Sequence, residues 1–213
     1  MNQLTIPSVG DPFELPPLPF AVDALEPFMS AECVDLLYNG YHTAYVIGLN
    51  GRLSNLLLTG YSLAELLKRS SSLGVGLQTH LAGHYNLSLF WKTLRPRAVD
   101  KPDGILGEAI QVTFGGLKSL MNQITLLTHQ VLDDGWIWLV SRDGRLLLVT
   151  TTGHRNPLMD GGPAYQRGIP ILGLNLWKHA YYETYGNRLA DYLVHWWQHI
   201  NWREVENLYH RSL

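Results

Sequence analysis

The sequence is most specific at Gly173-Leu174-Asn175-Leu176-Trp177-Lys178-His179-Ala180-Tyr181-Tyr182. The apolar run from Ile169 to Leu174 predicts a buried β-strand, and the aromatic residues that follow predict a helix. An amide, an ammonium group and an imidazole therefore lie close together in the chain where a strand gives way to a helix. The remaining elements are organised around this junction.

Upstream of the junction the sequence predicts a β-hairpin. Strands are expected at Trp136 to Val140 and at Leu146 to Thr152, because the Asp143-Gly144 pair between them is typical of a hairpin turn. Four helices are expected in the same half of the chain. They are Ile105 to Phe114, Leu117 to Leu132, Arg188 to His199, and one from Asn201, where Asn201-x-x-Glu204 is a helix-start pattern.

The N-terminal half predicts a hairpin of helices. Ser30 can cap a helix that runs to about Asn50, and Ser62-x-x-Glu65 is a capping box that opens a shorter helix. A third helix is expected from Val75 to about Leu94. The inward face of the first helix, by α-helical spacing, consists of Val34, Leu37, Tyr41, Tyr45 and Gly48. The predicted domains are an N-terminal extension at 1–14, an α-hairpin domain at 15–97 and a C-terminal α/β domain at 98–213.

The composition is that of an ordered globular protein. Charged residues make up 16% of the 213 residues and hydrophobic residues 46%, which disfavours disorder. The formal net charge of -2 gives no reason to expect a nucleic-acid partner, and no apolar run approaches the length of a membrane span. The first Lys or Arg is Arg52 and the only cysteine is Cys33. We therefore expect a cytoplasmic protein without a signal peptide or transit peptide.

Ordered motifs from Leu15 to Tyr209 resemble those of the iron/manganese superoxide dismutases. The opening stretch is similar to that family's metal-binding signature, Asp-x-Trp-Glu-His-Ala-Tyr-Tyr, except at Asn175 and Lys178. Further matches are Gly83-His84-x-Asn86, Gly135-Trp136-x-Trp138-Leu139-Val140, Asn156-Pro157-Leu158 and Asn187-Arg188-x-x-Asp191-Tyr192. The resemblance implies an α+β fold, in which an N-terminal α-helical hairpin is followed by an α/β domain with a three-stranded antiparallel sheet.

The resemblance also implies where a metal would be bound. Family members hold it with three histidines and one aspartate, and in this chain Leu37, Leu87 and Asn175 stand at three of those positions. Only His179 keeps its donor. Because a redox-active ion needs three or four fixed donors, we expect no Mn or Fe cofactor and no catalytic residue.

Side chains that surround the metal in the family are kept in part. Tyr45 matches the tyrosine that gates substrate entry, and His154 matches the residue that hydrogen-bonds the metal-bound solvent. Without a metal, we expect this group to pack and hydrogen-bond as ordinary core residues. His80 and His84 have a spacing that can chelate a metal, but no third ligand is near them in the sequence. The resemblance implies that the former surroundings of the metal are Tyr41, Tyr45, Gly83, His84, Trp136, His154 and Trp177.

Lys178 bears on assembly. In the family dimer a glutamate at this position bonds the ligand histidine of the other subunit, so the resemblance places Lys178, His179 and Tyr182 at a dimer interface. Two lysines facing each other across a symmetric contact would repel. A partner that offers a carboxylate, or a rearranged dimer, is therefore favoured.

The sequence leads to three hypotheses about function. The first is a pseudoenzyme that serves as a structural or interaction subunit, its partner being itself, an active superoxide dismutase subunit or a larger assembly. The alternative is a dismutase with an atypical Mn or Fe site built from His179, Asn175, His84 and His154. The third is a small-molecule or regulatory binding module in the altered cleft.

Overall fold

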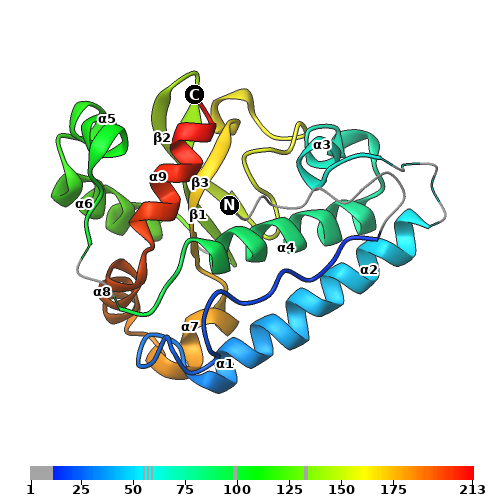
Figure 1. Cartoon of the computed structure of the whole chain (residues 1–213), viewed down its shortest axis with the longest axis horizontal. Coiled ribbons are helices and arrows are strands. Elements are labelled where there is room, and N and C mark those ends of the chain that lie inside the picture. The colour runs from blue at the N-terminus through cyan, green and yellow to red at the C-terminus, as the bar shows by residue number, and fades with distance from the viewer. Residues whose placement is uncertain (1–11, 55, 57, 59, 98–99, 132–133) are drawn as a thin grey trace.

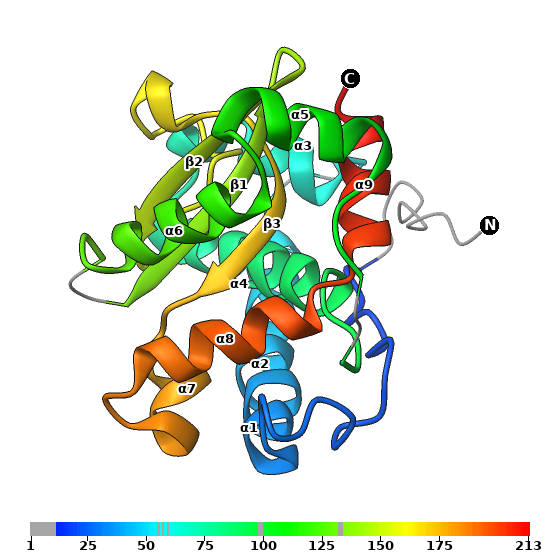
Figure 2. The same cartoon turned by 90° about the vertical axis from the view of Figure 1, so that its left-hand side faces the viewer.

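A helical hairpin and a unit containing a β-sheet make up the molecule (Figures 1 and 2). The structure is a computed structural model that describes residues 12–213 except 55, 57, 59, 98–99 and 132–133. Most of the predicted N-terminal extension, residues 1–11, lies outside the described residues, as does Leu132, the predicted end of one helix. This architecture confirms the α+β fold with a three-stranded antiparallel sheet.

The first long helix is one rod with a π-helical middle. It consists of α1 (Ala31–Asp35), η1 (Leu36–His42) and α2 (Thr43–Leu53), and the Ser30 hydroxyl caps its start by accepting from the Cys33 N–H at 3.1 Å. Within η1 the Thr43 N–H reaches the Tyr38 carbonyl, five residues back. A π turn holds one more residue than an α turn and therefore shifts which side chains face inward.

The π turn corrects the predicted inward face of the rod. Tyr41 was expected to face inward, but it is 38% exposed, whereas the next residue, His42, is fully buried. Leu37 and His42 are five residues apart and both buried, which is the spacing of a π turn. The α-helical periodicity resumes with the buried Val46 and Leu49.

The rod packs against α4 (Val75–Lys92), the second long helix of the hairpin. Between them lie α3 (Leu63–Leu67) and the short η2 (Ser70–Ser72). The predicted capping box of α3 is present, since Ser62 accepts from the Glu65 N–H while the Glu65 carboxylate accepts from the Ser62 N–H.

The sheet is antiparallel with strand order β2-β1-β3. The strands are β1 (Gly135–Arg142), β2 (Arg145–Thr152) and β3 (Ile169–Asn175), and Asp143 and Gly144 both have positive φ, as a tight hairpin turn requires. β1 is central and its residues from Trp136 to Ser141 are buried. Trp136 pairs with Asn175, so the end of β3 lies against the start of β1.

Six further helical segments complete the described chain. The helix predicted to end at Leu132 ends at Thr128 instead. No described helix is long and apolar enough to cross a membrane. The segments are α5 (Gly104–Phe114), α6 (Leu117–Thr128), η3 (Ala164–Gln166), α7 (Lys178–Tyr185), α8 (Leu189–His199) and α9 (Trp202–Arg211).

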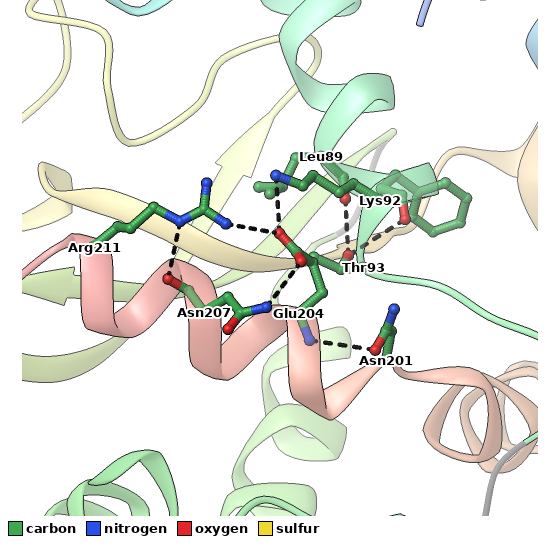
Figure 3. Close-up of polar contacts among 8 residues, drawn as sticks. Leu89, Lys92, Thr93, Asn201, Glu204, Asn207 and Arg211 are labelled. Carbon is green, nitrogen blue, oxygen red and sulfur yellow. Dashed lines mark hydrogen bonds and ion pairs between the residues drawn. The ribbon is translucent and has the colours of Figure 1, made fainter. Parts of the chain in front are cut away.

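A seam joins the end of α4 to the turn between α8 and α9. The Arg95 N–H donates to the His199 carbonyl at 2.8 Å, and the Asn201 N–H donates to the Thr93 carbonyl at 2.9 Å. Beside them the Lys92 ammonium pairs with Glu204 at 2.8 Å, and Arg211 reaches the same carboxylate at 3.5 Å (Figure 3). The hairpin and the sheet unit are therefore tied by backbone and side-chain bonds. They also share one continuous hydrophobic core.

Candidate functional site

Asn175 ends β3 and is fully buried. Its side-chain oxygen accepts a hydrogen bond from the Trp177 N–H at 3.0 Å, which turns the chain from the strand into α7. Its side-chain NH₂ group has no hydrogen-bond partner among the described residues. The amide oxygen is therefore engaged in shaping the junction. The main-chain carbonyl of Asn175 also accepts a hydrogen bond, from the Tyr192 hydroxyl at 2.9 Å.

Leu37 and Leu87 approach the sheet from the two long helices. Leu37 lies in η1 and Leu87 in α4, and both belong to the same cluster of buried side chains as Trp136. Trp136 stacks on Trp138 with ring centroids 4.9 Å apart, and Phe90 meets it edge-on at 5.9 Å. Both leucines are thus part of the main apolar core, and neither offers a lone pair to a ligand.

His179 lies one residue into α7, between two aromatic rings. Its imidazole stacks on Tyr41 at 4.4 Å and on Trp177 at 5.1 Å between ring centroids. Its carbonyl accepts from the Cys33 thiol at 3.6 Å, which joins α7 to α1. Burial lowers the pKa of His179, and the Asp134 carboxylate partly opposes this shift. The imidazole is therefore neutral at neutral pH.

Tyr45 of α2 and His154 of the loop after β2 form a short hydrogen bond. The Tyr45 oxygen lies 2.6 Å from Nε2 of His154. Burial raises the pKa of Tyr45 to about 12 and lowers the pKa of His154 to about 4, so a neutral phenol is bonded to a neutral imidazole. Gly83 makes room for this pair, since a Cβ there would lie 2.6 Å from the Tyr45 ring.

A histidine pair, His42 with His84, was not predicted from the sequence. Nε2 of His42 lies 2.8 Å from Nδ1 of His84, and the Ser88 hydroxyl lies 3.3 Å from His42. Burial lowers the pKa of His42 to about 3 and that of His84 to about 4. The π turn buries His42, and the only sequence feature near it is Asn39-Gly40, an unusual pair within a helix.

The predicted site residues form two separate groups of contacts. Tyr41, His179, Trp177, His154 and Tyr45 form a chain of ring contacts and one hydrogen bond. His84, in contrast, is bonded to His42 and is not part of that chain. Among the described residues, no three His, Cys, Asp or Glu side chains converge as a metal site would require.

Lys178 and Tyr182 lie on the outer side of α7. Both are exposed, and the Lys178 N–H donates to the Asp134 carboxylate at 2.9 Å. Asp134 thereby supplies an acceptor to the first turn of α7, which carries no acidic side chain of its own. The Lys178 ammonium has no ion-pair partner within the described ranges.

Comparison with known families agrees with this arrangement of elements. Residues 12–95 match the description "Iron/manganese superoxide dismutases, alpha-hairpin domain". Residues 102–208 match "Iron/manganese superoxide dismutases, C-terminal domain". The first match covers the rod, α3 and α4, and the second covers the sheet, α7, α8 and most of α9. The chain belongs to the iron/manganese superoxide dismutase family.

Proposed function

We propose that this chain is a dismutase-fold protein without a working Mn or Fe site, and that it serves as a structural or interaction subunit. The observation that carries the proposal is the state of three expected ligand positions. Leu37 and Leu87 are core residues, and the oxygen of Asn175 is bonded to the backbone of Trp177. A metal that the family normally binds would find one imidazole, His179, as its ready donor.

Physical chemistry favours the replacements as a set. A buried carboxylate without a cation would be an uncompensated charge, and the neutral amide of Asn175 removes that cost. Two buried leucines contribute about 1.5 to 3 kcal/mol each through the hydrophobic effect. The three replacements together therefore suit a pocket converted into protein core, and the residues present do not fit a tightly held Mn or Fe ion.

The alternative is a dismutase with an atypical metal site. One observation favours it. Tyr45 and His154 form a short hydrogen bond, and the His154 ring contacts Trp177, which in turn stacks on His179. The four side chains that it would use are His179, Asn175, His84 and His154. The bonding described above speaks against this set, since His84 is engaged with His42 and the Asn175 oxygen with Trp177.

Metal analysis with an activity assay tests the proposal. The protein as purified, and after refolding with Mn or Fe, should carry far less than one equivalent of either metal. It should show no dismutation of superoxide beyond that of the free ion. Near-stoichiometric metal, together with activity that a chelator abolishes, would refute the proposal and favour the atypical site.

A second test concerns assembly and uses a substitution at Lys178. In a symmetric contact through α7, two unpaired ammonium groups would approach each other and repel. Lys178→Glu should therefore strengthen such a contact, since the glutamate could accept from His179 of the other copy. Sedimentation of both forms across a range of concentrations measures this. If the unmodified chain is already a tight dimer that Lys178→Glu weakens, the repulsion argument is wrong.

A further inference from the structure

A surface pocket lies where α7 meets α8 and the segment before α1. Its volume is about 400 Å³, which is within the range of small-molecule sites. Tyr185 of α7, His195 of α8 and Pro27 all contribute to its lining, and Figure 2 shows α7 and α8 side by side. The pocket is at the opposite end of α7 from His179, and the described residues that line it include none of the expected ligand positions. Its occupancy is therefore independent of the proposed function.

Tyr185 and His195 share a hydrogen bond at the pocket. The Tyr185 hydroxyl lies 2.9 Å from the Phe28 carbonyl oxygen and 2.7 Å from Nδ1 of His195. Burial and the nearby Asp191 raise the pKa of Tyr185 to about 12, so the hydroxyl keeps its proton. Because a carbonyl can only accept, the phenol donates to Phe28, and Nδ1–H of His195 donates to the phenol oxygen. In a neutral His195 ring, Nε2 is therefore left as a hydrogen-bond acceptor.

Arg188, which directly precedes α8, is held in place by the end of α7. Its Nε donates to the Tyr185 carbonyl at 3.3 Å, and one of its terminal nitrogens donates to the Thr184 carbonyl, also at 3.3 Å. Both carbonyls belong to the last turn of α7, where helix carbonyls lack partners within the helix. The other terminal nitrogen donates to the Asp191 carboxylate at 3.2 Å. An arginine has five N–H donors, so two stay available to a ligand.

The charges of the pocket suit a ligand that is itself doubly charged. Arg188 and Asp191 lie 3.2 Å apart, and their side chains are 64% and 51% exposed, so a ligand can reach both from solvent. A simple anion would be repelled by Asp191, and a simple cation by Arg188. A ligand with a positive and a negative group side by side meets an opposite charge at each of them.

Pro27 and Val194 add an apolar wall to the pocket. Val194 is 54% exposed although its side chain is hydrophobic, so an apolar group placed against it would remove surface from water. An α-amino acid combines these features. Its carboxylate and its ammonium group are bonded to one carbon atom, which brings the two charges about as close as those of the Arg188–Asp191 pair, and its side chain projects from the same atom.

We infer that this pocket binds a free α-amino acid with an apolar side chain, such as leucine. The ligand carboxylate accepts from Arg188, and its ammonium group donates to Asp191 and to Nε2 of His195. The ligand side chain lies against Pro27 and Val194. Because exposed ion pairs contribute little to affinity, the dissociation constant should be about 1 to 10 mM. Occupancy of the pocket then follows the amino-acid concentration in the millimolar range.

Titration of the full chain, labelled with ¹⁵N, with L-leucine tests this inference by NMR. The amide signals of Thr184, Val194 and His195 should shift saturably, whereas that of Val112, which is on α5 and does not line the pocket, should not move. Two analogues of leucine each lack one charge. They are 4-methylpentanoate, which has no ammonium group, and 3-methylbutylamine, which has no carboxylate. Each should bind about 3-fold more weakly than leucine, or weaker still.

Substitutions assign each ligand charge to its residue. In Arg188→Gln, leucine should bind no better than 3-methylbutylamine, because the group that receives the carboxylate is gone. In Asp191→Asn, leucine should bind no better than 4-methylpentanoate. Arg203→Gln is the matched control, since Arg203 is exposed on α9 and does not line the pocket, and it should leave the affinity for leucine unchanged. Thermal melts of each variant confirm that the fold is kept.

Three results would overturn the inference. The first is the absence of a saturable shift of the pocket signals up to about 50 mM leucine. The second is equal binding of leucine and both analogues, which would mean that the two charges are not read together. The third is an affinity for leucine that Arg188→Gln and Asp191→Asn both leave unchanged.

Discussion

Three buried side chains decide which chemistry the β3–α7 junction allows. Leu37 and Leu87 bring only carbon to the core, and Asn175 directs its oxygen to the Trp177 N–H. His179 alone keeps an imidazole at an expected ligand position, where it stacks between Tyr41 and Trp177. Under the proposed function, metal binding should therefore return only when all three positions are changed together.

The first prediction is a metal-dependent gain in stability for the triple variant Leu37→His, Leu87→His and Asn175→Asp. Each single change should only destabilise, by roughly 1 to 3 kcal/mol, because it buries a polar or charged group without a partner. In the triple variant, coordination of Mn or Fe should offset these costs. Thermal melts of every form with and without metal measure this. No metal-dependent rise in the triple variant would mean that these positions do not surround a former site.

The second prediction concerns acid sensitivity. Burial holds the folded-state pKa of His42 near 3 and those of His84 and His154 near 4, below the ordinary value of 6.5. The unfolded chain therefore binds more protons, and stability should fall as the pH drops from about 6.5 to about 4. At pH 5 the loss should be roughly 1 to 2 kcal/mol for each histidine.

Denaturant unfolding at both pH values measures this loss. His210→Gln is the control, because it removes an exposed histidine and leaves the three buried ones in place. Equal free energies of unfolding at pH 7 and pH 5 would contradict the three lowered pKa values.

The sequence could predict some of these residues and not others. Motif matching was enough to single out Leu37, Leu87 and Asn175, and the structure buries all three, although their role stays a prediction. His42 could not be found in this way, because a stripe drawn at α-helical spacing passes through Tyr41. A search for α-helical periodicity does not detect the extra residue of a π turn.

At the scale of the elements, the π turn η1 separates two halves of one helix, each of which has α-helical periodicity. The N-terminal half buries Val34 and Leu37, and the C-terminal half buries Val46 and Leu49. Elsewhere the local sequence was sufficient to predict the structure. The turn at Asp143-Gly144 and the capping box at Ser62 follow from residue preferences that act within a few positions, and both predictions are confirmed.

The third prediction is that the rod tolerates loss of a residue only inside η1. Deleting Gly40 should turn the π turn into an α turn while Leu37 and His42 keep facing the core, because their separation becomes that of an α-helix. Deleting Ala44 from α2 should instead rotate the residues on one side of it by about 100° and bury the wrong side chains. Thermal melts of both deletions give the comparison, and equal damage from the two would count against this view of η1.

At the scale of the whole molecule, Glu204 shows what sequence patterns leave out. Asn201 caps α9 as predicted, by accepting from the Glu204 N–H at 3.2 Å. The Glu204 carboxylate, however, is bound to Lys92 and Arg211 and does not complete a capping box (Figure 3). A partner so distant in the sequence cannot be deduced from local spacing. The division into domains at residues 97 and 98 likewise stays a prediction.

The fourth prediction is that Glu204→Gln costs about 1 to 3 kcal/mol of stability, because it weakens a largely buried pair and leaves Lys92 without its counter-charge. Asp191→Asn is the matched control. It breaks the exposed pair with Arg188 and should cost about 0 to 1 kcal/mol. Chemical denaturation of both variants measures the loss in the free energy of unfolding. Equal losses would show that the ion pair at the seam adds no more stability than a surface pair.

The seam between α4 and the α8–α9 turn also orders events while the chain is being made. Thr93 and Arg95 leave the ribosome well before their partners His199 and Asn201. Until then Leu94, which is buried and pairs with Ile200 in the folded chain, lacks this part of its cover. During synthesis the helical hairpin therefore exposes apolar surface at the end of α4 until α8 has been made. Such transiently exposed surface is where chaperones bind and aggregation begins.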